Sequence, residues 1–60
     1  MKSYSSSKTY EFYIIQIGFS IMVNYNEKIR CFVDKSGKEM SKEFVQDLER
    51  QGIIKISIIN

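Results

Sequence analysis

The chain has 60 residues and a formal net charge of +2, with one cysteine and no histidine. A chain of this length forms at most one domain and buries only about 60% of the surface that its unfolded form exposes. A single cysteine excludes a disulfide within the chain, and without histidine there is no recognisable set of zinc or iron ligands. We therefore expect no metal and no cofactor, and any extra stability has to come from a second subunit.

The composition is biased in an informative way. Alanine, proline, histidine and tryptophan are absent, while isoleucine occurs ten times and lysine seven times. AT-rich coding produces such a bias, which favours a low-GC bacterium or its phages and plasmids, and a very small protein fits a mobile element. The apolar segment near the N-terminus lacks the small-residue cleavage site of a secretory signal, so we expect a cytoplasmic protein with a reduced Cys31.

The first half of the chain contains a polar arm and a long apolar stretch. Residues 1–8 are rich in serine and are expected to form a mobile arm or a frayed edge, ahead of a single domain at residues 9–60. The stretch YEFYIIQIGFSIMVNY follows at residues 10–25. Its uninterrupted apolar core at residues 12–23 is too short for the roughly 20 residues of a membrane-spanning helix. From residue 15 onward, apolar and polar residues alternate, which predicts a half-buried strand.

The continuity of this strand is an open question. Residues 10–25 exceed the usual strand length of about 5 or 6 residues. Gly18 is where we expect a bulge, a bend or a break. The stretch therefore forms either one long strand or two shorter strands that meet at Gly18.

Two turns and two further strands are predicted next. The segment NYNEK at residues 24–28 is typical of a hairpin turn, and KIRCFVD at residues 28–34 is predicted to be a strand. The segment DKSGK at residues 34–38 supplies a second turn, in which Gly37 can take the left-handed conformation. Residues 38–40 can add a short third strand.

One helix and a final strand complete the predicted fold. The segment SKEFVQDLERQG has Ser41 as N-cap, Glu43 in the positive first turn and Gly52 just past the end. Met40 and Val45 have the spacing of a hydrophobic staple. The strand IIKISIIN follows. We predict a small α+β domain, in which an antiparallel sheet of three or four strands carries one helix on one face, in the order strand, strand, optional short strand, helix, strand.

Alternation assigns the apolar residues to two faces of the sheet. The face expected to lie under the helix, together with the helix residues Phe44, Val45 and Leu48, consists of Ile15, Ile17, Phe19, Ile21, Val23, Ile29, Cys31, Val33, Ile54, Ile56 and Ile58. The opposite face holds Tyr10, Phe12, Ile14, Met22, Phe32, Ile53 and Ile59, mixed with Gln16, Ser20, Arg30, Lys55 and Ser57. This second face is too apolar for open water, unless residues 10–14 fold back and cover it or the stretch divides at Gly18.

A binding surface for a protein is therefore predicted on the second face. The expected partner-binding residues are Tyr10, Phe12, Ile14, Met22, Arg30, Phe32 and Lys55. A homodimer is favoured because symmetric pairs dominate soluble oligomers, and the apolar stretch could pair edge to edge with that of a second copy. We expect a non-enzymatic protein that inhibits or regulates a host protein by covering part of its surface.

No catalytic motif accompanies this surface. Cys31 has no histidine to act as its base, so a nucleophilic role is not expected. The carboxylates of Glu39 and Glu43, and those of Glu43 and Asp47, are one helical turn apart, as paired catalytic acids might be. On a short surface helix, such spacing is typical of carboxylates that simply face solvent. The DKSGK segment has a single glycine and lacks the pattern of a phosphate-binding loop or a calcium loop.

Binding of single-stranded nucleic acid is the main alternative. Tyr10, Phe12 and Phe32 on one face, bordered by lysine and arginine, would resemble a platform on which bases stack. The basic excess that such proteins carry is missing, and the chain is too short for an RNA-recognition sheet with two helices. The sequence favours a protein partner over nucleic acid and predicts no membrane association.

Overall fold

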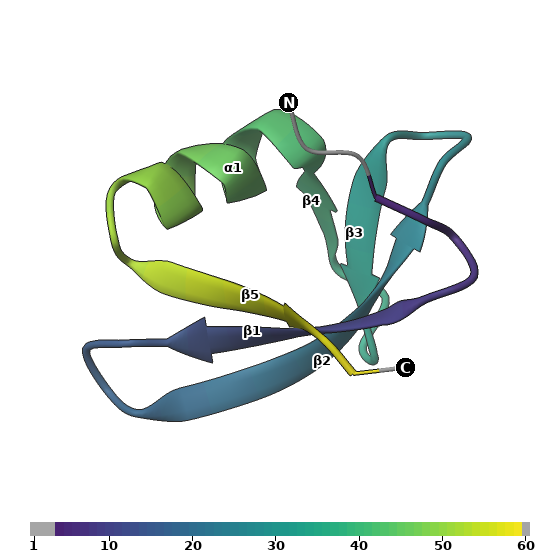
Figure 1. Ribbon diagram of the computed structural model, residues 1–60. Helices are drawn as coiled ribbons and strands as arrows, with labels where there is room; N and C mark the ends of the chain where they lie inside the picture. The colour runs from purple at the N-terminus through teal and green to yellow at the C-terminus, as the bar shows by residue number, and fades with distance from the viewer. Residues whose placement is uncertain (1–3, 60) are drawn as a thin grey trace.

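The computed structural model describes residues 4–59, and it is a five-stranded antiparallel sheet with one helix over one face (Figure 1). The elements are β1 (Thr9–Ile14), β2 (Phe19–Asn26), β3 (Cys31–Asp34), β4 (Glu39–Ser41), α1 (Lys42–Arg50) and β5 (Ile54–Ile58). The strand order in the sheet is β4-β3-β2-β1-β5. The predicted α+β class is therefore confirmed, with five strands in place of three or four.

The long apolar stretch divides into two strands at the turn that contains Gly18. β1 ends at Ile14, β2 begins at Phe19, and the Gly18 N–H donates to the Ile14 carbonyl at 2.9 Å. Gly18 has a φ of 67°, a conformation that glycine adopts at little cost. Of the two alternatives for residues 10–25, a pair of shorter strands is confirmed.

The register of this hairpin reverses the predicted faces of β1. Ile14 lies opposite Phe19, and Phe12 lies opposite Ile21, so even-numbered residues of β1 share a face with odd-numbered residues of β2. A single continuous strand would instead place all odd-numbered residues on one side. Because the turn exchanges odd for even, the even-numbered residues of β1 come to lie under the helix together with the odd-numbered residues of β2.

The core reflects this exchange. Its buried residues are Tyr10, Phe12, Val23, Tyr25, Phe32, Val45 and Ile54. The prediction that Tyr10, Phe12 and Phe32 lie on an exposed face is wrong, because they are only 3%, 2% and 0% exposed. The prediction of an inner position is also wrong for Ile15, Ile17, Ile29 and Phe44, which the structure leaves exposed. Phe19 and Ile58 lie on the predicted face, opposite Ile14 and Tyr10, but they remain exposed there. Val23 and Ile54 are buried as predicted, with Ile21, Leu48 and Ile56 packed against them.

Aromatic rings surround Phe32 at the centre of the core. Its ring centroid lies 4.8 Å from that of Tyr4, 5.0 Å from those of Phe12 and Tyr25, and 5.6 Å from that of Tyr10. Several of these pairs have the edge-to-face geometry that aromatic quadrupoles favour. Phe32 thus joins β1, β2 and β3 to the segment that precedes β1.

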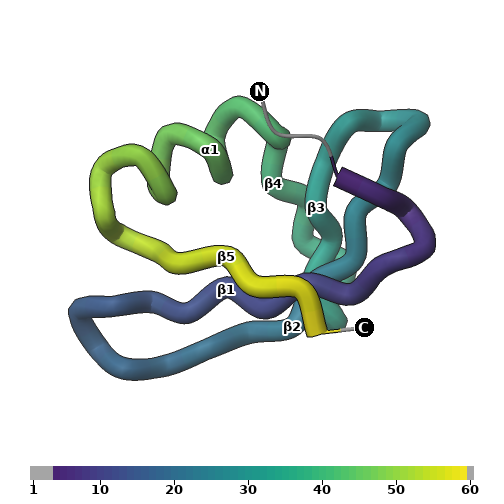
Figure 2. The backbone as a smooth tube through the Cα atoms, in the orientation of Figure 1, coloured from purple at the N-terminus to yellow at the C-terminus, as the bar shows by residue number. Residues whose placement is uncertain are grey.

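That segment is part of the predicted polar arm, of which residues 1–3 lie outside the described residues. Tyr4 packs on the aromatic cluster, and the Ser5 main-chain N–H donates to the Tyr10 hydroxyl at 2.8 Å. The N–H of Glu27 donates to the Ser6 Oγ at 3.2 Å, so residues 4–8 lie beside the turn between β2 and β3 (Figure 2). Residues 4–8 therefore close one end of the core.

The helix covers the rest of this face. Ser41 is the N-cap as predicted, since its Oγ accepts from the Phe44 N–H at 3.1 Å. After the last turn, Gly52 takes a φ of 78°, and the Ile53 N–H donates to the Leu48 carbonyl. α1 begins at the β4 edge of the sheet and ends near the β5 edge (Figure 1). This course places Val45 over the sheet, where it is fully buried.

Replacement of the central ring tests this core. The Phe32→Ala change should lower the free energy of unfolding by about 3 to 5 kcal/mol, because a cavity replaces a buried ring. A domain of this size has only about 3 to 9 kcal/mol in total. We therefore expect the variant to be largely unfolded at 25 °C in urea denaturation followed by circular dichroism.

The matched control is Phe44→Ala on the helix, where the side chain is 53% exposed. This change should cost about 1 kcal/mol or less. Equal losses in the two variants would contradict the placement of Phe32 at the centre of the core.

Candidate functional site

The seven residues predicted to bind a partner do not form one surface. Tyr10, Phe12 and Phe32 belong to the buried core, so their side chains are not available to a partner. Ile14 is half-buried and packs against the same core. The apolar anchors of the predicted site are thus mostly used to stabilise the fold.

The other three predicted residues lie on different parts of the surface. Met22 is 39% exposed and sits on the face of the sheet away from the helix. Lys55 is exposed on that same face, but β1 lies between its strand and the strand of Met22. Arg30 is exposed in the turn between β2 and β3, where it has a φ of 54°. The structure brings none of them together with the predicted aromatic anchors.

A different group of apolar residues is exposed at the end of the β1–β2 hairpin. We call it the hairpin-end patch, and it consists of Ile15, Ile17, Phe19 and Ile53. Their side chains are 49%, 68%, 56% and 41% exposed, respectively. The Ile15 N–H donates to the Ile53 carbonyl at 3.1 Å, which joins the turn to the start of β5. Ile15, Ile17 and Phe19 were expected in the core. Gly18, as a break in the strand, is the sequence feature that indicates their position at the exposed end of a hairpin.

The hairpin-end patch continues onto the outer face of the sheet. Tyr13 is 40% exposed there and lies opposite Ser20 on one side and Lys55 on the other. Glu11 lies in the next row, opposite Met22 and Ser57. This face alternates apolar and polar side chains, whereas the hairpin end carries four large apolar side chains without polar ones between them in the patch.

An open hollow of about 650 Å³ lies at the other end of the sheet, between residues 4–8 and the β2–β3 turn. Its lining residues are Ser6, Asn24, Tyr25, Asn26, Glu27, Lys28 and Val33. Several polar groups here already have partners within the chain. The Asn24 side-chain amide donates to the Thr9 hydroxyl, and the Lys28 N–H donates to the Asn26 side-chain oxygen. These bonds tie the turn to its neighbours.

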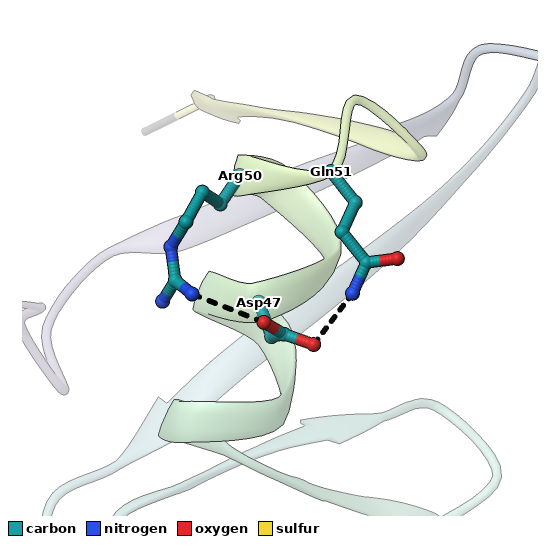
Figure 3. Close-up of polar contacts among 3 residues, drawn as sticks. All are labelled: Asp47, Arg50 and Gln51. Atoms are coloured by element: carbon teal, nitrogen blue, oxygen red, sulfur yellow. Dashed lines mark hydrogen bonds and ion pairs between the residues drawn. The ribbon is translucent and has the colours of Figure 1, made fainter.

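The side chains considered for a chemical role, Cys31 and Asp47, also form hydrogen bonds to nearby residues. Cys31 is half-buried at the start of β3, and its Sγ donates to the Ile29 carbonyl at 3.3 Å. Figure 3 shows the Asp47 carboxylate, which accepts from Arg50 Nη1 at 3.1 Å and from Gln51 Nε2 at 2.6 Å. Within residues 4–59, no group of three or more histidine, cysteine, aspartate or glutamate side chains is placed to hold a metal ion.

Comparison of the chain with protein-family models, with curated proteins and with solved structures finds no match in any of the three. In the described part of the chain, no helix has both the length and the apolar character needed to cross a membrane.

The turn between β3 and β4 contains a carboxylate with a lowered pKa. Asp34 Oδ1 accepts from the Ser36 hydroxyl at 2.6 Å, the Ser36 N–H at 2.9 Å and the Lys38 N–H at 3.0 Å. The bond from the Ser36 side chain, followed by that from the Lys38 main chain, lowers the pKa of the Asp34 carboxyl below its ordinary value of 3.8. The charged form of Asp34 is therefore the one that stabilises the turn.

The pH dependence of stability tests this arrangement. Because the folded pKa of Asp34 is lowered, its contribution is present above pH 3.8 and disappears as the pH falls through the lowered value. Asp34→Asn should unfold at lower urea concentration than the unmodified protein at pH 7, and the difference should shrink below about pH 4.

Ser36→Ala is the companion variant, because it removes the hydroxyl donor and should return the Asp34 pKa toward its ordinary value. An Asp34→Asn protein whose urea midpoint differs from that of the unmodified chain by the same amount at pH 7 and at about pH 2 would contradict this role.

Proposed function

We propose that the protein is a small, non-enzymatic protein-binding module that acts by covering part of the surface of another protein. The observation that carries this proposal is the hairpin-end patch, where four large apolar side chains are 41% to 68% exposed. Single exposed apolar side chains are common on proteins, whereas a group of them at one place on the surface is typical of an interaction site. Aromatic residues such as Phe19 are enriched in protein interfaces.

The proposed partner is a host protein in the cytoplasm of a low-GC bacterium, and the proposed role is inhibition or regulation. The basis is the AT-rich character of the composition together with the small size of the chain. A module of this kind needs no catalytic group, because an apolar patch that seats on a functional surface blocks access to it. Its affinity would come from a few buried side chains at the centre of the contact.

Binding of single-stranded nucleic acid is a weaker proposal. It depended on an exposed platform made of Tyr10, Phe12 and Phe32, and these residues form the buried core. The net charge of +2 offers little attraction for phosphate.

Retention of a host protein on the immobilised chain tests the proposal. We would compare the unmodified chain with the double variant Ile17→Ser/Phe19→Ser in an extract of a low-GC bacterium, at physiological salt. A specific partner should be retained in near-equimolar amount by the unmodified chain and reduced at least tenfold by the double variant.

Ile29→Ser is the matched control, since Ile29 is 45% exposed in the turn at the opposite end of the sheet. It should retain the partner as the unmodified chain does. A set of retained proteins that is the same for the double variant and the unmodified chain would refute the patch as the binding surface.

A further inference from the structure

The strand β5 forms an edge of the sheet whose outer main chain is unpaired among residues 4–59. The Ile59 N–H donates to the Thr9 carbonyl at 2.9 Å, and Ile53 accepts from the Ile15 N–H. In an antiparallel ladder, the residues that bond to one neighbour alternate with those that face the other side. Ile54, Ile56 and Ile58 therefore direct their N–H and carbonyl groups away from β1 and toward solvent.

The two edges of the sheet differ in how well they are protected. β4 has only three residues and runs directly into α1, so it offers little main chain for pairing. β5 has five residues, IKISI, with no proline, no glycine and only Lys55 as a charged residue. Natural proteins usually shorten, charge or bend an exposed edge to prevent pairing with another chain. β5 is the edge that remains able to accept a further strand.

The β1–β2 stretch offers less main chain for such pairing. β1 has neighbours on both sides, whereas β2 pairs with β3 only through residues 23–26, so residues 19–22 are paired on the β1 side alone. Edge-to-edge contact through residues 10–14 is therefore excluded, and β5 is the longest edge left for pairing of this kind.

The pattern of β5 matches a second copy of itself in the antiparallel direction. With a two-fold axis at Ile56, Ile54 lies opposite Ile58 of the second copy, and Lys55 lies opposite Ser57 of the second copy. A parallel arrangement in register would place the two Lys55 side chains next to each other, and like charges on neighbouring strands are destabilising. The charge pattern thus favours the arrangement that closes a symmetric dimer.

We propose that two copies of the chain associate through antiparallel pairing of their β5 strands, which joins the two sheets into one continuous sheet. The outward groups of Ile54, Ile56 and Ile58 would form about six main-chain hydrogen bonds across the axis. Ile58, which shares a face with Tyr10 and is 61% exposed, would gain an apolar neighbour in Ile54 of the second copy. Pairing therefore satisfies both the unpaired main chain and an exposed side chain.

Ile15, Ile17 and Phe19 of the hairpin-end patch stay accessible in this dimer, whereas Ile53, which precedes the paired strand, comes to lie opposite Ile59 of the second copy. Because the two β5 strands run in opposite directions, the two hairpin ends lie at opposite ends of the joined strands. Pairing through β5 is independent of the proposed host partner, since Ile17 and Phe19 take no part in it. The contact area of five-residue strands is below the roughly 1,200 Å² of stable complexes, so we expect a dissociation constant on the order of micromolar.

The test measures the molar mass by sedimentation equilibrium over a range from about 1 μM to about 1 mM. The unmodified chain, with a monomer mass of 7.1 kDa, should approach twice that mass as the concentration rises. Ser57→Lys places a second lysine opposite Lys55 of the other copy and should weaken the dimer at least tenfold. Within each copy the new lysine faces Glu11, so the fold itself is not disfavoured.

Two further variants make the result specific. Ser20→Lys introduces the same charge on β2, away from the β5 edge, and should dimerise like the unmodified chain. Ile58→Pro removes an outward N–H that has no partner within the sheet, and it should give a folded monomer by circular dichroism. A monomer at all concentrations, or a dimer unaffected by Ser57→Lys and Ile58→Pro, would overturn the proposal. A dimer that is lost in Ile17→Ser but kept in Ser57→Lys would assign self-association to the hairpin-end patch instead and would equally overturn it.

Discussion

The packing of aromatic rings around Phe32 is the interaction on which the rest of the structure depends. Phe32 is fully buried, and the rings around it come from β1, β2 and the segment before β1. Aromatic pairs of this geometry contribute about 0.5 to 1.5 kcal/mol each beyond the area they bury. In a chain whose only cysteine is unpaired, a few such contacts are a large share of the total stability. The aromatic cluster therefore takes the place that disulfides or metals have in other small domains.

The choice of core residues determines which apolar side chains remain on the surface. The even-numbered residues of β1 and the odd-numbered residues of β2 face the core. The side chains of the turn between these strands have no core surface to pack against. Ile15 and Ile17 in the turn, and Phe19 at the start of β2, stay exposed. β5 lies at the border of the sheet because it is the last strand in the order β4-β3-β2-β1-β5. The exposed hairpin end thus follows from the limited coverage that one nine-residue helix provides, and the free edge follows from the strand order.

These two surfaces differ in kind. The hairpin-end patch offers large apolar side chains, which suits a partner with an apolar cavity. The β5 edge offers main-chain groups with a two-fold pattern, which suits an identical strand. Because they use different residues, a dimer formed at the edge would present two copies of the patch. Two linked patches would raise the effective affinity for a partner that is itself dimeric.

Local signals in the sequence determined the elements, whereas only the tertiary structure decided which faces are buried. Ser41, Gly37 and Gly52 act on their immediate neighbours, so the helix and its limits and the β3–β4 turn could be predicted from the sequence. The faces could not, because they depend on the register across the turn at Gly18. Side chains alternate with a period of two, and pairing Ile14 with Phe19 exchanges inside and outside for everything on one side of the turn. For that reason Tyr10 and Phe12 became core, while Phe32 did so because the turn between β2 and β3 pairs it with Tyr25, and the exposed site moved to the hairpin end.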